Sequence, residues 1–181
     1  MTVYPIPMIE KQNYRYGGIA FGGTSKSRGD RIHAACDLIV PIYTPVYAVE
    51  RGKVLEVPKS AFFQDTYSVI VRHNDFIVRY AELDKNRLVK EGDEIEAGTQ
   101  LGVVGVNNKG RGMLHLEMFK GTATGPYKRV DNSTYDFVTS GNYQRRRDLM
   151  DPTPYLEKWK LWNDWSRYSC QQPEEINYSE Y

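Results

Sequence analysis

The 181-residue chain is poor in the residues and segments that mark several large protein classes. Its two cysteines, Cys36 and Cys170, cannot form the disulfide framework of a small secreted domain. No apolar run approaches the roughly 18 residues that a membrane span needs. The 24 Lys and Arg residues nearly balance the 23 Asp and Glu residues, so the basic excess of a dedicated nucleic-acid binder is missing. These absences predict a globular domain without a membrane span and without a nucleic-acid partner.

Residues 36–119 consist of short apolar or alternating segments separated by turn residues, which indicates strands rather than helices. One hairpin is predicted around residues 50–52 and another around Asn74-Asp75. In the segment MLHLEMF, alternation is strict, and alternate residues of a strand share a face. The residues expected on one face are Met113, His115, Glu117 and Phe119. The regular strand spacing predicts a mostly β, antiparallel sandwich.

The flanking segments have different compositions. Residues 1–30 are punctuated by Gly and Pro and are expected to be irregular, with 24–30 either a plain exposed loop or one wall of a cleft. The domain proper is expected over 31–156, followed by an amphipathic C-terminal helix over 157–170 and a flexible acidic tail over 171–181. The Arg145-Arg146-Arg147 cluster is expected to form a solvated surface turn, with contact to an acidic partner as the alternative.

Three of the potential metal ligands have a suggestive spacing. His33 and Asp37 lie four residues apart, and His115 lies within the alternating strand. Two His and one Asp leave the fourth position of a zinc site to water, which is typical of catalytic zinc sites. The alternative from spacing alone is an exposed His33, an Asp37 that caps a turn and a His115 satisfied in the core.

Several segments, taken in order, resemble one family. RIHAACDLIVPIYTPVYAVERGKV is similar to the first signature of the LytM/lysostaphin-type zinc peptidases, and SVIVRHNDFIVRYAELDK resembles their central hairpin. LVKEGDEIEAGTQLGVVG, MLHLEMFKG and DPTPYL are similar to the segments that follow in that family. The resemblance extends from about Gly17 to Leu156. It implies a LytM/lysostaphin-like β fold, a Zn²⁺ ion held by His33, Asp37 and His115, and activity on the peptides of bacterial peptidoglycan.

The same resemblance reveals departures from the family pattern. Glu82 and Met113 stand where the family has two catalytic histidines, and Ala35 replaces a glycine of the first motif. Glu82 is the candidate general base, because a carboxylate beside a zinc site can take a proton from water. The alternatives are that Glu82 is a fourth metal ligand, which would close the site, or that it lies in solvent away from it.

Other residues near the motifs have expected roles. Tyr80, two residues before Glu82, is expected on the same face and therefore in the substrate site, together with Met113. Glu117 is either an acceptor for the ring N–H of a metal ligand or part of a structural contact elsewhere. His73 is expected to hydrogen-bond across its hairpin, away from the metal.

Two functions remain open on the sequence. The first is a zinc endopeptidase that cuts cross-bridges or stem peptides of peptidoglycan. The second is a degenerate peptidase domain that binds cell-wall peptide or a protein without cutting, with the C-terminal tail as a possible contact for a protein partner. The N-terminus lacks the basic start and apolar core of a secretory signal. Either the numbering starts after cleavage of a signal, or the protein is delivered to the periplasm or wall by a phage or a secretion system, which is the route expected here.

Overall fold

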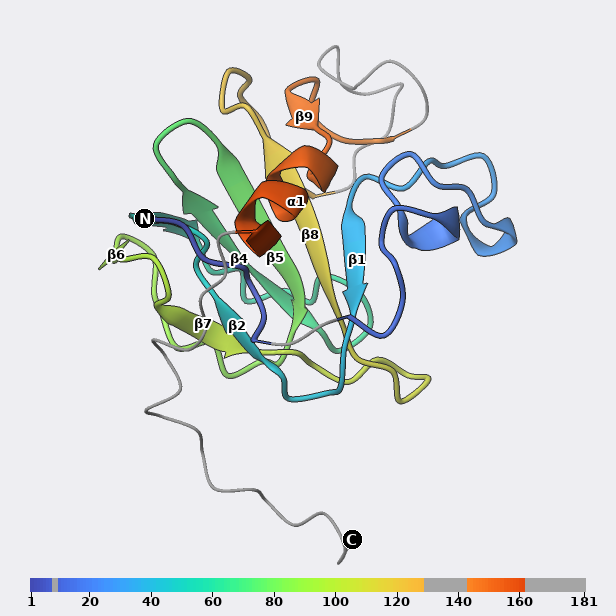
Figure 1. Cartoon of the computed structure of the whole chain (residues 1–181), viewed down its shortest axis with the longest axis horizontal. Helices are drawn as coiled ribbons and strands as arrows, with labels where there is room; N and C mark the ends of the chain where they lie inside the picture. Colours follow the sequence, from blue (N-terminus) through green and yellow to red (C-terminus); the bar gives the residue numbers. More distant parts are fainter. Residues whose placement is uncertain (8–9, 129–142, 162–181) are drawn as a thin grey trace, which may run out of the picture.

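A computed structural model describes residues 1–7, 10–128 and 143–161, and most of its strands form one large antiparallel sheet (Figure 1). Across that sheet the order is β1 (Cys36–Ile39), β8 (Met113–Phe119), β5 (Ile77–Leu83), β4 (Tyr67–Arg72), β3 (Gly52–Glu56) and β6 (Glu94–Ile95), and β9 (Leu149–Met150) pairs with β8. A second sheet pairs β2 (Pro45–Tyr47) with β7 (Gln100–Val103). The mostly β, antiparallel fold with one helix is as predicted.

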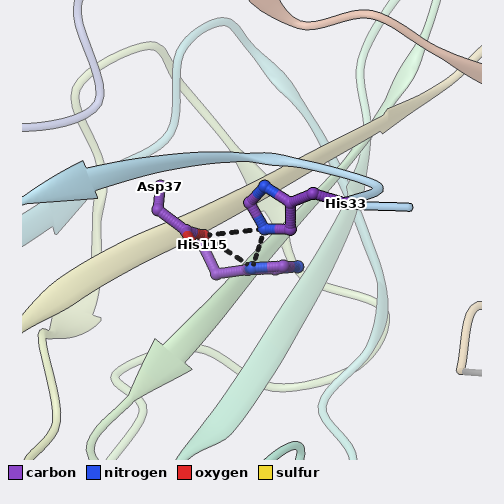
Figure 2. Close-up of side chains that lie close together, drawn as sticks. All are labelled: His33, Asp37 and His115. Atoms are coloured by element: carbon purple, nitrogen blue, oxygen red, sulfur yellow. Dashed lines mark hydrogen bonds and ion pairs between the residues drawn. The ribbon is translucent and has the colours of Figure 1, made fainter. Parts of the chain in front are cut away.

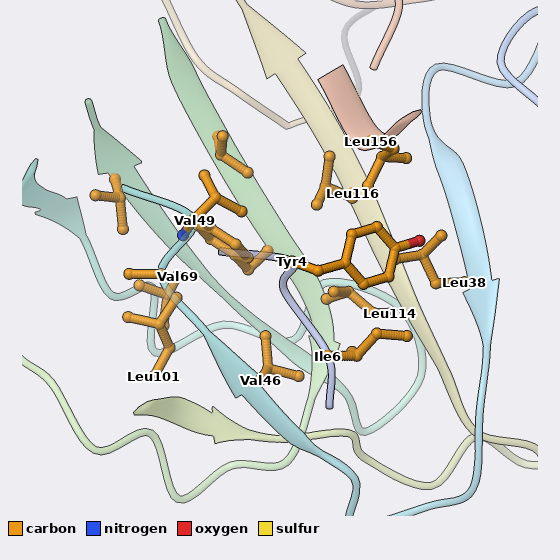
Figure 3. Close-up of a cluster of buried hydrophobic side chains, with 14 of the residues drawn as sticks. Tyr4, Ile6, Leu38, Val46, Val49, Val69, Leu101, Leu114, Leu116 and Leu156 are labelled. Carbon is orange, nitrogen blue, oxygen red and sulfur yellow. The ribbon is translucent and has the colours of Figure 1, made fainter. Parts of the chain in front are cut away.

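One face of the large sheet carries the main apolar core (Figure 3). Leu114 and Leu116 of β8 project into it, and Val46 and Leu101 of the small sheet pack against them from the other side. All four side chains are fully buried. Transfer of such side chains from water stabilises the fold by roughly 1.5–3 kcal/mol each. The small sheet is therefore the second layer of the sandwich.

The opposite face of β8 and β5 is polar at its centre. In the ladder between these strands, Arg79 lies opposite Glu117 and Ala81 lies opposite His115. Asp37 of β1 lies opposite His115 on its other side. Residues directly opposite one another in an antiparallel ladder share a face, so the alternation predicted for residues 113–119 gathers these side chains on one surface.

One of the two predicted hairpins is confirmed and the other is wrong. β4 and β5 pair antiparallel across the turn at residues 73–76. The segment at residues 50–52 is not the turn of a hairpin, because β2 pairs with β7 while β3 pairs with β4 and β6. Gly52 serves close packing instead, since a Cβ there would lie 2.4 Å from the carbonyl oxygen of Arg72.

The N-terminal segment is irregular, as predicted, but it contributes to the core. Its described part holds only the short 3-10 helices η1 (Gly17–Ile19) and η2 (Lys26–Arg28). Tyr4, Ile6 and Tyr14 are nevertheless buried in the main core. The N-terminal segment therefore packs against the sandwich through these three side chains, which its irregular composition did not predict.

Helix α1 (Thr153–Leu161) begins four residues earlier than the predicted start at residue 157. The backbone N–H of Thr153 donates to the Asp151 carboxylate at 2.8 Å, which satisfies a donor at the helix start. Leu156 and Trp159 bury the apolar side of the helix in the main core. The rest of the predicted helix and the acidic tail, residues 162–181, lie outside the described residues. Within the described residues no helix is long and apolar enough to cross a membrane.

The prediction of a solvated turn holds for Arg147, which is exposed in a turn, and is wrong for Arg145 and Arg146. Arg145 and Arg146 are 4% and 2% exposed. Arg145 donates to Glu117 at 2.8 and 3.0 Å, and Arg146 donates to Asp148 at 2.7 and 3.0 Å. The expectation failed because the acidic partners of both guanidinium groups lie within the same chain.

Candidate metal centre

Strand β8, strand β1 and the loop before β1 bring His33, Asp37 and His115 together (Figure 2). The Nδ1 atom of His115 lies 2.8 Å from Oδ1 of Asp37, and Nε2 of His33 lies 3.2 Å from the same oxygen. The two ring nitrogens are 3.4 Å apart. All three residues are buried. The alternative of an exposed His33 and an Asp37 that caps a turn is therefore wrong, because His33 is 1% exposed and Asp37 contacts both histidines.

The outer nitrogen of each imidazole has an acceptor of its own. Nδ1 of His33 lies 2.9 Å from the carbonyl oxygen of Ala20, to which it donates. Nε2 of His115 lies 2.9 Å from Oε1 of Glu117. If a metal ion displaced the protons that the inner nitrogens share with Asp37, the outer nitrogens would keep theirs. Each inner nitrogen would then direct a lone pair toward the space beside the Asp37 carboxylate. Two imidazole lone pairs and a carboxylate that converge within 4.8 Å are a suitable donor set for zinc.

The charges of the cluster fit the same chemistry. Burial raises the cost of a charged Asp37, but hydrogen bonds from His115 and His33 outweigh that cost and lower its pKa. Burial alone would lower the pKa of His115, and its hydrogen bonds to Asp37 and Glu117 instead raise it to about 9. Burial lowers the pKa of His33. The Asp37 and Glu117 carboxylates therefore favour a positive charge on His115. A bound metal ion would place a positive charge at the same point.

Glu117 is held in place by two arginines. Nε and Nη2 of Arg145 donate to its Oε1 at 3.0 and 2.8 Å, and Nη1 of Arg79 lies 3.7 Å from its Oε2. Burial raises the pKa of Glu117, but the nearby Arg145 charge and the His115 hydrogen bond lower it further than burial raises it. Glu117 thus stays ionised and hydrogen-bonds to the His115 ring, the contact that the first of its two expected roles requires.

Glu82 reaches the polar face through a β-bulge. Tyr67 pairs with Leu83 and Ser68 with Ala81, so Glu82 is an extra residue in β5. Its φ of 62° lies in the left-handed region, which is costly for a residue with a side chain. The bulge turns Glu82 into the pocket that also contains His115, and burial raises its pKa to about 7. Glu82 is buried, so the alternative of a solvated side chain is wrong.

The bulge also corrects the prediction for Tyr80. Without an extra residue, Tyr80 and Glu82 would share a face, but Tyr80 lies opposite Leu116 and points into the main core. Its hydroxyl accepts from the backbone N–H of Val49 and lies 3.0 Å from Nε2 of His73. Tyr80 therefore has no place in the substrate site, and His73 serves structure on the core face.

A pocket of about 770 Å³ opens over the cluster. Met113, half-buried at the start of β8, is among its lining residues, as are Ser27 and Arg28 of the 24–30 loop. No sequence motif indicated Phe62, whose ring lies 5.0 Å from that of His115 and 4.5 Å from the Arg79 guanidinium. The loop around Phe62 has no motif, and only the tertiary fold places it there.

Comparison with known proteins agrees with this architecture. The profile of peptidase family M23 matches residues 31–127, more than half of the chain. The chain belongs to peptidase family M23. The peptidoglycan DD-endopeptidase ShyC of Vibrio cholerae is 27% identical over 122 residues, which are 67% of this chain and 24% of that protein. The lipoprotein YgeR of Escherichia coli is 28% identical over 103 residues, 56% of this chain and 41% of that protein. The chain thus spans less than half the length of these curated relatives.

Solved structures of M23-like peptidases share the fold. A zinc-containing peptidase from Vibrio cholerae is 26% identical with a TM-score of 0.51, over 65% of this chain and 36% of that one. The catalytic domain of lysostaphin from Staphylococcus simulans superimposes with a TM-score of 0.55, at 23% identity, over 78% of this chain and 90% of that domain. Membership of the LytM/lysostaphin-type family is as the sequence motifs predicted.

Proposed function

We propose that this M23 protein is a zinc-dependent endopeptidase that hydrolyses peptide bonds of bacterial peptidoglycan. The observation that carries the proposal is the convergence of His33, Asp37 and His115 at the base of the pocket. These three side chains would hold the zinc ion. When bound, the ion would supply Lewis acidity, which lowers the pKa of water and polarises a peptide carbonyl.

Glu82 would act as the general base. Its carboxylate faces the same pocket as the cluster, and burial raises its pKa to about 7. A base with a pKa near the working pH accepts a proton from the attacking water and later returns it to the leaving amine. Within the described residues, the set of ligand atoms that lie within 4.8 Å of one another comprises His33, Asp37 and His115 without Glu82. That separation favours Glu82 as base over Glu82 as fourth ligand.

Other parts of the pocket would position the substrate. Phe62 and Met113 offer apolar surface to the peptide, because both line the pocket and both are only half-buried. Glu117 would fix the orientation of the His115 ring through its Nε2 atom, and Arg145 would hold Glu117 in place. Arg28 would be a donor to a developing oxyanion, because its Nη2 lies 3.6 Å from Oδ2 of Asp37 and it lines the pocket.

One observation favours a second candidate function. Met113 lines the pocket at the family's second catalytic histidine, and a thioether can neither donate a hydrogen bond nor exchange a proton. The protein would then be a domain that binds wall peptide or a protein partner without cutting. Loss of one oxyanion donor typically costs about 10²–10³ in rate, so a working enzyme with this pocket should be slow.

Digestion of purified peptidoglycan sacculi tests the proposal. The zinc-loaded protein is incubated with sacculi, with and without a chelator, and the released fragments are weighed by mass spectrometry. We expect chelator-sensitive release of stem or cross-bridge fragments, which also identifies the bond. An Asp37→Ala variant, shown to be folded by circular dichroism, is the control for contaminating hydrolases. Sacculi that bind the protein but release nothing would support the second candidate.

The proposed substrate requires the protein to reach the cell wall. Delivery by a phage particle or a secretion system is part of the proposal, and detection of the protein in virions or secreted material tests it. A protein found in cytosolic fractions alone would contradict it.

A further inference from the structure

The charge of the pocket differs from the charge of the chain. The whole sequence is nearly neutral, with 24 basic and 23 acidic residues. Among the described residues that line the pocket, histidines aside, seven are basic and three are acidic. A concave surface of one charge sign focuses its field and attracts ligands of the opposite sign. The acidic side chains, Asp37, Glu56 and Glu82, do not restore the balance.

The floor of the pocket already carries excess positive charge. Arg79 and Arg145 both line it and are 5% and 4% exposed. The single carboxylate between them is Glu117, which also accepts from His115. Two buried guanidinium groups therefore share the Glu117 carboxylate, and Glu56 adds a weaker attraction to Arg79. A bound metal ion would add further positive charge. Charge of this kind interacts strongly because burial limits screening by water and salt.

The rim adds cations on a preformed loop. Lys109 and Arg111 are exposed and line the pocket from the turn at residues 107–111. The side-chain oxygen of Asn107 accepts from the backbone N–H groups of both residues, each at 3.0 Å. Asn107 is buried and also hydrogen-bonds to Glu82. One amide thus ties the cationic turn to the candidate base, so these charges are held near the reacting atoms.

We propose that the pocket selects peptides that carry free carboxylates, with Lys109 and Arg111 as the residues that recognise them. This inference rests on the proposed function and narrows it. Stem peptides with acidic groups would be substrates, and uncharged bridges of glycine would be poor ones. The carboxylate would accept charge-assisted hydrogen bonds from the rim, which are stronger than neutral ones. Electrostatic attraction would also speed its encounter with the pocket.

Binding of matched probes tests this without any cleavage. Fluorescein-labelled Gly-Glu-Gly-Gly-Gly amide, its Gly-Gln-Gly-Gly-Gly counterpart and pentaglycine amide differ in one side chain. Anisotropy titrations of the full, zinc-loaded chain give the affinities. We expect the Glu probe to bind about tenfold more tightly than the Gln probe, and the difference to shrink at high salt. Pentaglycine with a free carboxyl terminus tests whether a terminal carboxylate is recognised in place of a side chain.

Charge-reversal variants locate the recognition. The double variant Lys109→Glu, Arg111→Glu should remove the preference for the Glu probe. The double variant Lys85→Glu, Lys90→Glu makes an equal charge change at two exposed residues outside the pocket lining and should preserve it. If the Glu and Gln probes bind equally to the wild type, the proposal is wrong. Equal loss of preference in both variants would reduce it to an effect of net charge and overturn it. A polyphosphate chain that binds as tightly as the Glu probe would also overturn it.

The result separates this inference from the proposed function. A Glu preference in binding, together with intact sacculi after digestion, would retain the carboxylate site and reject the hydrolase. Digestion of sacculi without any preference for the Glu probe would retain the hydrolase and reject the carboxylate site.

Discussion

The two faces of the strand pair β5–β8 use the same kinds of residue for opposite purposes. His73 packs on the core face and His115 on the polar face, and both are buried, at 2% and 7% exposure. His73 contacts neutral partners, the Tyr80 hydroxyl and the carbonyl oxygen of Arg51. His115 contacts two carboxylates, Asp37 and Glu117. Burial alone therefore does not distinguish a structural histidine from a candidate metal ligand, whereas the charge of its partners does.

The pKa values of the two histidines express this difference. Burial lowers the pKa of His73 to about 4, and hydrogen bonds to backbone carbonyls only partly oppose it. Burial alone would also lower the pKa of His115, yet its two carboxylate partners raise that pKa to about 9. The core face thus excludes positive charge, and the polar face attracts it. Four predictions test this contrast.

Removal of His115 should have the largest effect. His115→Ala deletes one of three proposed ligands, so zinc affinity should fall by more than the ~10–100-fold that loss of a supporting outer partner costs. Competition with a fluorescent zinc chelator measures the affinity. The matched control is His73→Gln on the core face, which should keep the affinity within about threefold of the wild type. Equal losses in the two variants would show that the two faces are not distinct in function.

Glu82→Gln should have the next largest effect. A general base typically contributes about 10²–10⁴ to the rate, so kcat on a fragment released from sacculi should fall by that factor while zinc content is unchanged. The base must be ionised to accept a proton, and its raised pKa of about 7 means that kcat/KM rises as pH increases through about 7. This rise should vanish in the variant. A variant that loses zinc along with its activity would instead identify Glu82 as a ligand.

His73 should make the stability of the fold depend on pH. Its folded pKa of about 4 lies below the unfolded value of 6.5, so the unfolded chain binds the additional proton. The contribution is fully present above pH 6.5 and is lost as pH falls toward 4. The lost part of the unfolding free energy is about 3 kcal/mol. Urea titrations across this range measure it, with His73→Gln as the variant in which this slope should be absent. An unchanged slope in that variant would refute the assignment.

The smallest effect on zinc affinity is expected from Arg145, which contacts the proposed ligand His115 only through Glu117. Arg145→Met leaves Glu117 with one of its guanidinium partners removed, so the His115 ring should be held less firmly. Zinc affinity should fall by about tenfold, and Arg145→Lys should restore part of it. Arg146→Met serves as the control, because Arg146 binds Asp148 instead of Glu117. A similar loss in both arginine variants would indicate general destabilisation.

The sequence predicted the parts of the site that depend on strict alternation. His115 and Glu117 were expected on one face of their strand because period-two alternation is a local property, and the ladder confirms that arrangement. The same rule failed at Tyr80 because Glu82 is an extra residue in the strand. A bulge depends on the register with the neighbouring strand, so it leaves little trace in a single segment. The bulge moved the candidate base to the site and left Tyr80 in the core.

Long-range partners were the other source of error. The turn at residues 50–52 has good hairpin composition, yet β2 and β3 belong to different sheets. Arg145 has the composition of a surface turn, yet it pairs with Glu117, which lies 28 residues earlier in the chain. Such pairings are decided by tertiary packing and carry no local pattern.

An anomalous difference map, recorded at the zinc edge from crystals of the zinc-loaded protein, tests the central claim most directly. The account predicts one peak in contact with His33, Asp37 and His115, with the Glu82 carboxylate outside the first shell. A peak that Glu82 contacts would mean a closed structural site. The absence of a peak at these three residues, in crystals grown with excess zinc, would contradict the account.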